Sequence, residues 1–158
     1  MSQASSALER SRSDRLRSPL LLALSVLLAL ETVGGLVLFA AFLTMGRRPG
    51  EALHTLAGVP LAALYALYQW RHWRRVRPLR ARLDYVLGLV AALVMGLTLL
   101  TGLGLGAWWW QARVTARSGG EVAYPPLLSA LHNIGSMLVM AFVGAHLGAV
   151  LMRDRPRP

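Results

Sequence analysis

The sequence of 158 residues has no cysteine, no lysine and only seven acidic residues. A chain without cysteine makes no disulfide, binds no metal through thiolates, ligates no iron–sulfur cluster and attaches no haem covalently through a C-x-x-C-H motif. The sequence also has no Walker loop, no G-x-G-x-x-G element and no Ser–His–Asp arrangement. The nucleotide-binding and hydrolytic classes that these motifs identify are therefore not indicated.

The sequence has long apolar runs instead. Hydrophobic residues make up 55% of the chain, and the mean hydropathy is +0.48. A soluble domain of this length needs a more polar surface, so the composition indicates membrane spans of roughly 20 residues each. Pro60 lies inside one of them, where proline is tolerated. Four spans are expected, at residues 19–45, 51–70, 84–107 and 126–152.

The arginines give the orientation of these spans. All 17 basic residues are arginine, and 13 of them lie before the first span, between the second and third spans, or after the fourth. Because cytoplasmic loops are enriched in basic residues, we expect both termini in the cytoplasm. The loop at 71–82, RHWRRVRPLRAR, belongs to this pattern, so topology in a lipid membrane explains the net charge of +10, and no nucleic-acid partner is expected. The four remaining arginines are Arg47, Arg48, Arg113 and Arg117.

The chain has four histidines, and two of them share an apolar segment. His132 and His146 stand at positions i and i+14. Because an α-helix turns about 100° and rises about 1.5 Å per residue, their rings lie within roughly 40° of each other and about 21 Å apart. In the expected topology His54 and His132 lie near the outer face, and His72 and His146 lie toward the inner face. The histidines thus form two levels, each with one ring from the second span and one from the fourth.

This two-level arrangement suits a porphyrin iron. Polar residues inside a membrane are costly and usually serve a function, and bundle cores hold cofactors between facing side chains. Two neutral imidazoles fill both axial positions of haem iron. We therefore expect two haems, or one at minimum, with His54 and His132 as the outer pair and His72 and His146 as the inner pair of iron ligands.

Three segments resemble a known family: HTLAG at 54–58, TGLGLG at 101–106 and LHNIGSMLVMAFVGAHL at 131–147. They are similar to four-helix bacterial b-type cytochromes, which include cytochrome b(561)-like proteins and the membrane subunits of formate dehydrogenases and nickel–iron hydrogenases. A related membrane family of unassigned function has the same layout. The resemblance covers about residues 18–152. It implies two haems b, with His132 and His146 serving one each, and electron transfer between a redox partner and quinone.

The second span departs from this pattern. In cytochromes that use the second and fourth spans, the second span usually repeats the i, i+14 spacing, but here Tyr68 stands at that spacing from His54. His72, one turn further on, follows His54 by about five turns and about 27 Å. A tilt or a kink at Pro60 brings His72 level with His146 in one interpretation. In the other, His72 is an interfacial or phosphate-contacting residue, and the inner haem is lost or ligated differently.

Two glycines and one acidic residue complete the predicted site. Gly58 and Gly135 follow His54 and His132 by about one turn, where a missing side chain lets a flat macrocycle approach the backbone. Ordinary small-residue helix packing is the alternative for both glycines. Glu31 lies in the middle of the first span, either as a proton relay or quinone contact, or as a carboxylic acid hydrogen-bonded to a neighbouring helix.

Several polar residues are secondary candidates. We expect Asn133 and Ser136 to orient the ring of His132, and Thr98 and Thr101 to form hydrogen bonds between helices. Candidates for contacts with haem propionates are Arg47, Arg48, Arg113 and Arg117 at the outer face and Arg71 and Arg74 at the inner face. Topology alone also explains each of these arginines.

The sequence thus predicts an all-α integral membrane protein, a four-transmembrane-helix bundle of the bacterial inner membrane. Residues 1–17 form a polar tail, 18–152 the haem-binding transmembrane domain and 153–158 a basic tail. The expected function is electron transfer through the membrane; whether the chain itself has quinone oxidoreductase activity stays open. One alternative is a non-redox scaffold or assembly protein whose histidines serve helix packing. Another is a divalent-metal site or transporter, but the sequence has no carboxylate cluster near the histidines to support it.

Overall fold

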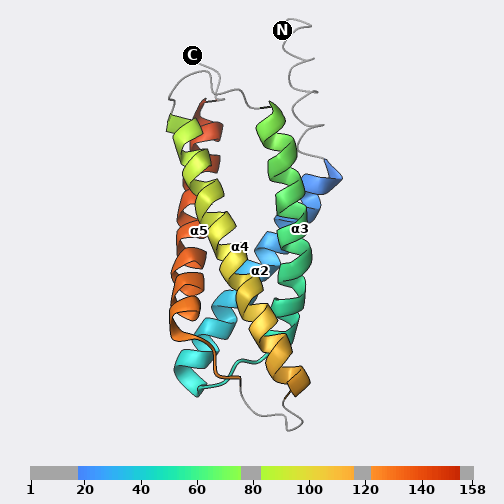
Figure 1. Ribbon diagram of the computed structural model, residues 1–158. Coiled ribbons are helices and arrows are strands. Elements are labelled where there is room, and N and C mark those ends of the chain that lie inside the picture. The colour runs from blue at the N-terminus through green and yellow to red at the C-terminus, as the bar shows by residue number, and fades with distance from the viewer. Residues whose placement is uncertain (1–17, 76–82, 116–121, 154–158) are drawn as a thin grey trace, which may run out of the picture. The chain divides into compact units, whose positions relative to one another are not determined.

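The computed structural model describes residues 18–75, 83–115 and 122–153, and these residues form four helices (Figure 1). They contain no strand, so the all-α prediction is confirmed for the described part of the chain. Each of the four expected spans lies within one of these helices. The tail at 1–17, most of the tail at 153–158 and Arg117 lie outside the described residues. The helices are α2 (Pro19–Met45), α3 (Glu51–Arg75), α4 (Leu83–Thr115) and α5 (Pro126–Arg153).

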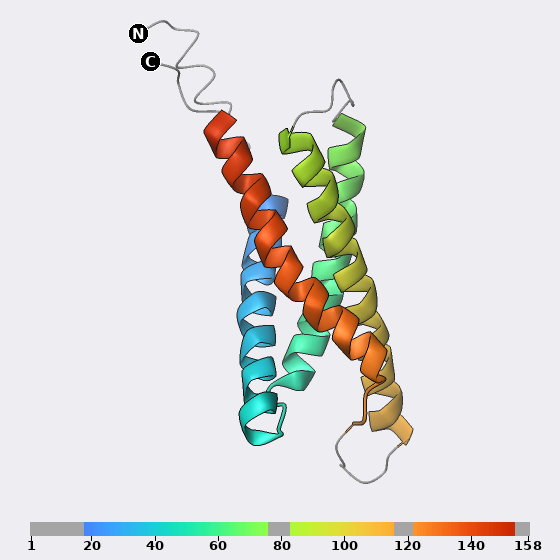
Figure 2. The ribbon, with the colours of Figure 1, turned by 90° about the vertical axis from the view of Figure 1, so that its left-hand side faces the viewer.

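Local signals in the sequence set the end of α2 and the start of α3. Gly46 ends α2 in the left-handed conformation with φ 64°, and its N–H donates to the carbonyl of Phe42 at 3.0 Å. Gly50 also has a positive φ, 82°, which a residue with a side chain rarely adopts. Glu51 then places a negative charge at the positive end of the α3 dipole. The short connection between the two helices follows from these residues (Figure 2).

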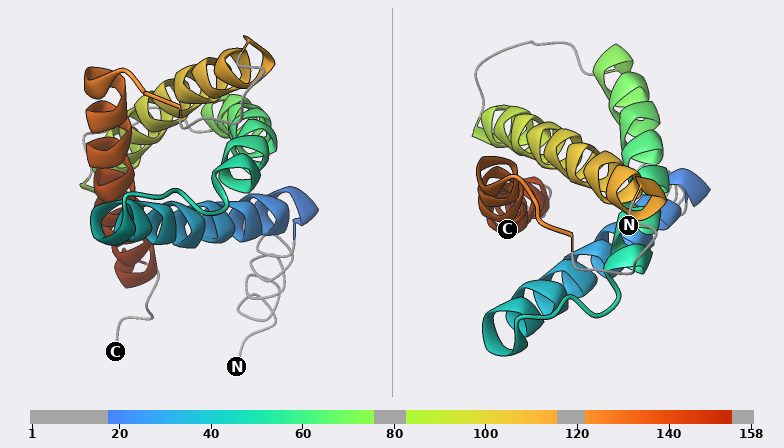
Figure 3. Two further views of the ribbon diagram at one scale, coloured as in Figure 1. Left: turned by 90° about the horizontal axis from the view of Figure 1, so that it is seen from below. Right: turned by 60° about the horizontal axis from the view of Figure 1, so that its bottom comes forward.

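Helix α4 is longer than the sequence predicted. We expected the third span to end near residue 107, but the helix continues through the three tryptophans at 108–110 to Thr115. The residues 108–115, WWWQARVT, include no glycine or proline, so no helix breaker follows the apolar run. Beyond the helix, the carbonyl of Ala123 accepts a hydrogen bond from Nε1 of Trp108 at 2.9 Å. This bond attaches the segment that leads into α5 (Figure 3) to α4, about two turns before that helix ends.

The helices pack as two pairs. α2 packs against α3 in one compact unit, α4 packs against α5 in the other, and the chain divides between Arg75 and Val76. Gly104 lies near Leu128, and Gly88 lies near His146, so α4 and α5 are antiparallel. The predicted domain at 18–152 therefore consists of two helical hairpins.

Three helices are long and apolar enough to cross a membrane: α2, residues Tyr85–Thr115 of α4, and residues Pro126–Ala149 of α5. α3 is not among them, and it carries Glu51 at its start and Arg71 and Arg74 near its end. Few of the described side chains are buried, and large apolar side chains such as Leu22 and Leu100 are more than half exposed. An apolar surface of this extent is suited to lipid contact.

Candidate functional site

His132 extends from α5 onto α4. Its Nδ1 atom lies 3.0 Å from the backbone carbonyl oxygen of Thr98 and 3.4 Å from Oγ1 of Thr101. Both threonines are buried. Because a carbonyl only accepts hydrogen bonds, Nδ1 is the donor in the contact with Thr98, and a neutral ring with this contact has its lone pair on Nε2. The α4–α5 unit thus fixes the position of this imidazole.

Two glycines of α4 make room for the two histidines of α5. A Cβ atom at Gly102 would lie 2.8 Å from Cε1 of His132, and a Cβ atom at Gly88 would lie 2.8 Å from Cε1 of His146. Gly88 and Gly102 have the same i, i+14 spacing as the two histidines. In an antiparallel pair these matched spacings set each imidazole against its own glycine. Any larger residue at either glycine would displace a ring.

His54 has a comparable seat in the α2–α3 unit. A Cβ atom at Gly35 would lie 3.2 Å from Cε1 of His54, and one at Gly34 would lie 3.8 Å from Nδ1. The Nδ1 atom is buried and lies 2.8 Å from Oε2 of Glu31. Glu31 thus contacts the neighbouring helix through a histidine; its role toward protons or quinone stays a prediction.

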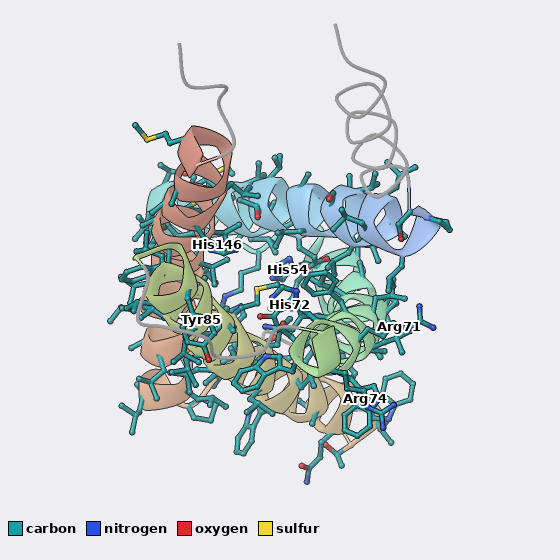
Figure 4. All side chains as sticks on the ribbon, turned by 90° about the horizontal axis from the view of Figure 1, so that it is seen from above. His54, Arg71, His72, Arg74, Tyr85 and His146 are labelled. Atoms are coloured by element: carbon teal, nitrogen blue, oxygen red, sulfur yellow. The ribbon has the colours of Figure 1, made fainter. Side chains whose placement is uncertain are left out.

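The fourth histidine, His72, lies near the end of α3. Its ring is stacked on that of Tyr68, with centroids 5.5 Å apart and planes inclined by 18°. Figure 4 shows His54 and His72 on one side of α3, whereas Arg71 and Arg74 extend on the other. This agrees with the spacing of the two histidines, which is about five full helical turns. His72 is exposed, so it lacks the enclosure of His54.

The two glycines predicted to contact a cofactor lie against the neighbouring helix of their own unit. A Cβ atom at Gly135 would lie 2.5 Å from Oγ1 of Thr98, and one at Gly58 would lie 3.8 Å from Oε2 of Glu31. Gly135 therefore allows α5 to approach α4, as small residues do in membrane bundles. A macrocycle contact for either glycine stays a prediction.

The residues that orient His132 differ from those that the sequence suggested. The hydroxyl of Ser136 donates to the backbone carbonyl of His132 at 2.8 Å, not to its ring. Asn133 is exposed. Thr98 and Thr101 contact the ring, and they were expected only as general hydrogen-bonding groups. Both threonines lie within about one turn before Gly102. This position indicates a contact with His132 only when it is known that α4 packs against α5.

Three of the candidate arginines contact aromatic rings within their own unit. The guanidinium of Arg74 lies 4.6 Å from the ring centroid of Trp70, and that of Arg113 lies 5.9 Å from the ring of Trp109. Arg48 lies 4.5 Å from the ring of Phe42, and its Nη1 is 3.9 Å from Oε1 of Glu51. The propionate contacts proposed for the arginines stay predictions.

A bare metal ion and a porphyrin iron need different numbers of protein ligands. Within 18–75, 83–115 and 122–153, no group of three or more His, Cys, Asp or Glu side chains forms a metal-binding cluster. A porphyrin provides the equatorial nitrogens itself and requires only axial ligands from the protein. Nδ1 of His132 is held by the carbonyl of Thr98, and the role of this ring as an axial ligand stays a prediction.

Comparison of the chain with models of protein families, with curated proteins and with solved structures gives no match. The resemblance to four-helix b-type cytochromes therefore rests on the segments at 54–58, 101–106 and 131–147.

Proposed function

We propose that the protein is a b-type cytochrome of the bacterial inner membrane that carries electrons between a redox partner and quinone. In this proposal His54 and His132 are the axial ligands of an outer haem, and His72 and His146 are those of an inner haem. The observation that carries the proposal is the contact between Nδ1 of His132 and the carbonyl of Thr98. Metal-ligating histidines are commonly oriented by such a contact on their second nitrogen.

The glycine contacts support the same role. Three of the four histidines pack against a glycine of the adjacent helix, at Gly35, Gly88 and Gly102. A ring held against a backbone keeps its orientation without a ligand, which is the preorganisation that a metal site needs. Bound haem supplies a one-electron redox centre, and the chain supplies fixed imidazoles and an apolar surround.

The proposal includes α3 as a fourth span, with both termini in the cytoplasm. Its 25 residues give a length of about 37 Å, enough to cross a hydrocarbon core of about 30 Å. Trp70 and Trp73, near its end, are 62% and 58% exposed, and Arg71 and Arg74 lie beside them. Exposed tryptophan and arginine together are typical of a helix end at the cytoplasmic interface.

A non-redox membrane scaffold is the second candidate, because the same contacts would also join each helix pair without a cofactor. The experiment that separates the two is a visible spectrum. The protein is expressed with ample haem supply and purified in detergent, and its oxidised-minus-reduced difference spectrum is recorded. We expect the bands of a low-spin b-type haem. A colourless preparation would support the scaffold.

The histidine variant makes this test specific. His132→Ala should remove one haem, because the iron loses a ligand that Thr98 positions. Asn133→Ala is the matched control, since Asn133 is the next residue and is exposed. Equal spectra for the two variants would contradict the assignment of His132 as a ligand.

A further inference from the structure

We propose that Glu31 is the positioning residue of His54: its carboxylate holds the Nδ1 side of the imidazole, directs Nε2 toward the haem iron and makes this ring a stronger donor than His132. This inference rests on the proposed function and goes beyond it, because it assigns different properties to the two ligands of the outer haem. Glu31 itself touches neither the iron nor a substrate in this proposal.

The first observation is the contact itself. Oε2 of Glu31 in α2 lies 2.8 Å from Nδ1 of His54 in α3, which is an ion-pair distance without the angles of a hydrogen bond. The side chains are 11% and 25% exposed, so the contact is largely shielded from the surroundings. Glu31 lies near the middle of α2, a helix apolar enough to cross a membrane. A carboxyl group at such depth is costly and calls for a polar partner, which His54 provides.

The second observation is that glycines surround the pair. Gly34 and Gly35 lie against the ring of His54, and Gly58 lies 3.8 Å, measured from an added Cβ, from Oε2 of Glu31. These glycines let α2 and α3 approach closely enough for the carboxylate and the imidazole to meet. The contact is therefore built into the backbone of the hairpin and does not depend on a long flexible side chain reaching a surface partner.

The third observation is the contrast with His132. There the Nδ1 contact is a neutral backbone carbonyl, that of Thr98 at 3.0 Å, whereas His54 faces a carboxylate. A carboxylate behind a metal-ligating histidine fixes the ring and raises its basicity as a ligand. A more basic axial ligand favours the oxidised iron. Removing the carboxylate should therefore raise the midpoint potential of the outer haem and leave the inner haem unchanged.

Glu31→Gln tests this inference, and Glu51→Gln is the matched control. Both variants replace a carboxylate by an amide. Glu51 lies less than one turn before His54 but contacts Arg48, at 3.9 Å. In redox titrations of the haem-loaded protein, we expect Glu31→Gln to raise the potential of one haem and to shift its low-spin electron paramagnetic resonance signal. Glu51→Gln should leave both haems as in the unmodified protein.

A second readout does not require haem. The chain has four histidines, so a sample labelled with ¹⁵N-histidine gives a simple nitrogen spectrum, and His54→Gln assigns the His54 signals by their loss. In the cofactor-free protein, Glu31→Gln should shift the Nδ1 signal of His54 and leave the signals of His132 and His146 in place. Glu31→Asp, which shortens the side chain by one methylene, should give a smaller shift of the same kind and serves if the glutamine variant does not fold.

The outcomes separate this inference from the proposed function. If the unmodified protein binds no haem, the proposed function fails, and the nitrogen spectra still decide whether Glu31 contacts the Nδ1 side of the ring. If haem binds but Glu31→Gln behaves like Glu51→Gln in both the potentials and the spectra, the positioning role of Glu31 is overturned and the cytochrome proposal stands.

Discussion

Gly102 of α4 lies directly against the imidazole of His132 in α5, so closely that a Cβ atom on the glycine would stand 2.8 Å from Cε1 of the ring. The same relationship recurs between Gly88 and His146, at the i, i+14 spacing along each helix. Each glycine thus leaves room for one imidazole, and this sets the position of each ring along the helix pair. Substitutions at these glycines should act on the histidines.

The first prediction concerns Gly102→Ala. The added methyl group collides with a ring that the carbonyl of Thr98 also holds, so the imidazole must turn away from its present position. We expect the haem affinity of the outer site to fall on the order of tenfold or more, because the loss of a residue that orients a metal ligand typically has an effect of this size. Titration of the purified protein with haem measures this change.

Gly96→Ala is the control for that variant. It makes the same chemical change in the same helix, but a Cβ atom at Gly96 meets nothing within 4 Å. In both variants the change from glycine to alanine favours the helix by about 1 kcal/mol of intrinsic helix propensity. If Gly96→Ala weakens haem binding as much as Gly102→Ala does, the contact with His132 is not the cause.

The second prediction concerns the close approach of α4 and α5 at Gly135. A Cβ atom there would lie 2.5 Å from Oγ1 of Thr98, so Gly135→Ala should lower the free energy of unfolding by about 1–3 kcal/mol, the usual cost of overpacking. Thr98→Ala removes the obstructing oxygen. In that background the cost of Gly135→Ala should largely disappear, in thermal or denaturant unfolding in detergent. Additive effects of the two substitutions would contradict the observed contact.

The third prediction decides between the two interpretations of His72. If His72 ligates the inner haem together with His146, His72→Ala lowers the haem content from about two to about one per chain. Tyr68→Phe is the control, because it keeps the ring that stacks on His72. We expect the control to retain both haems. A His72→Ala protein with undiminished haem content would show that the inner haem is absent or ligated differently.

The fourth prediction concerns α3 as a membrane span. Because the chain has no cysteine, each single-cysteine variant reports on one position only. Arg47→Cys, in the exposed connection between α2 and α3, should react with a membrane-impermeant maleimide on intact cells or spheroplasts. Arg80→Cys, between the second and third spans, should react only after permeabilisation. Labelling of both positions from the same side would exclude α3 as a span.

The helices could be predicted from the sequence because long apolar runs leave little choice of structure in a membrane. α2 has the predicted bounds, since Pro19 and Gly46 mark its ends. The predicted end of α4 was wrong, because the prediction followed hydropathy alone. Residues 108–115 contain no glycine or proline, so the helix continues beyond the apolar run to Thr115.

The contacts of the histidines could be predicted only in part. The spacing between Gly88 and Gly102 is readable in the sequence, but it has meaning only when α4 is antiparallel to α5. The contact between Glu31 and His54 could not be foreseen from a simple hairpin. Glu31 lies about four turns before the end of α2, whereas His54 lies in the first turn of α3. The two helices are therefore offset, and hydropathy carries no information about such an offset.

The central claim is that the histidines of the two hairpins hold haem iron, and the most direct measurement is the haem content of the unmodified protein. A pyridine haemochrome assay on detergent-purified protein, expressed with ample haem supply and referred to the protein concentration, gives this number. The account predicts about two haems b per chain, with low-spin spectra from two axial imidazoles. A protein that is folded and helical but contains no haem would contradict it.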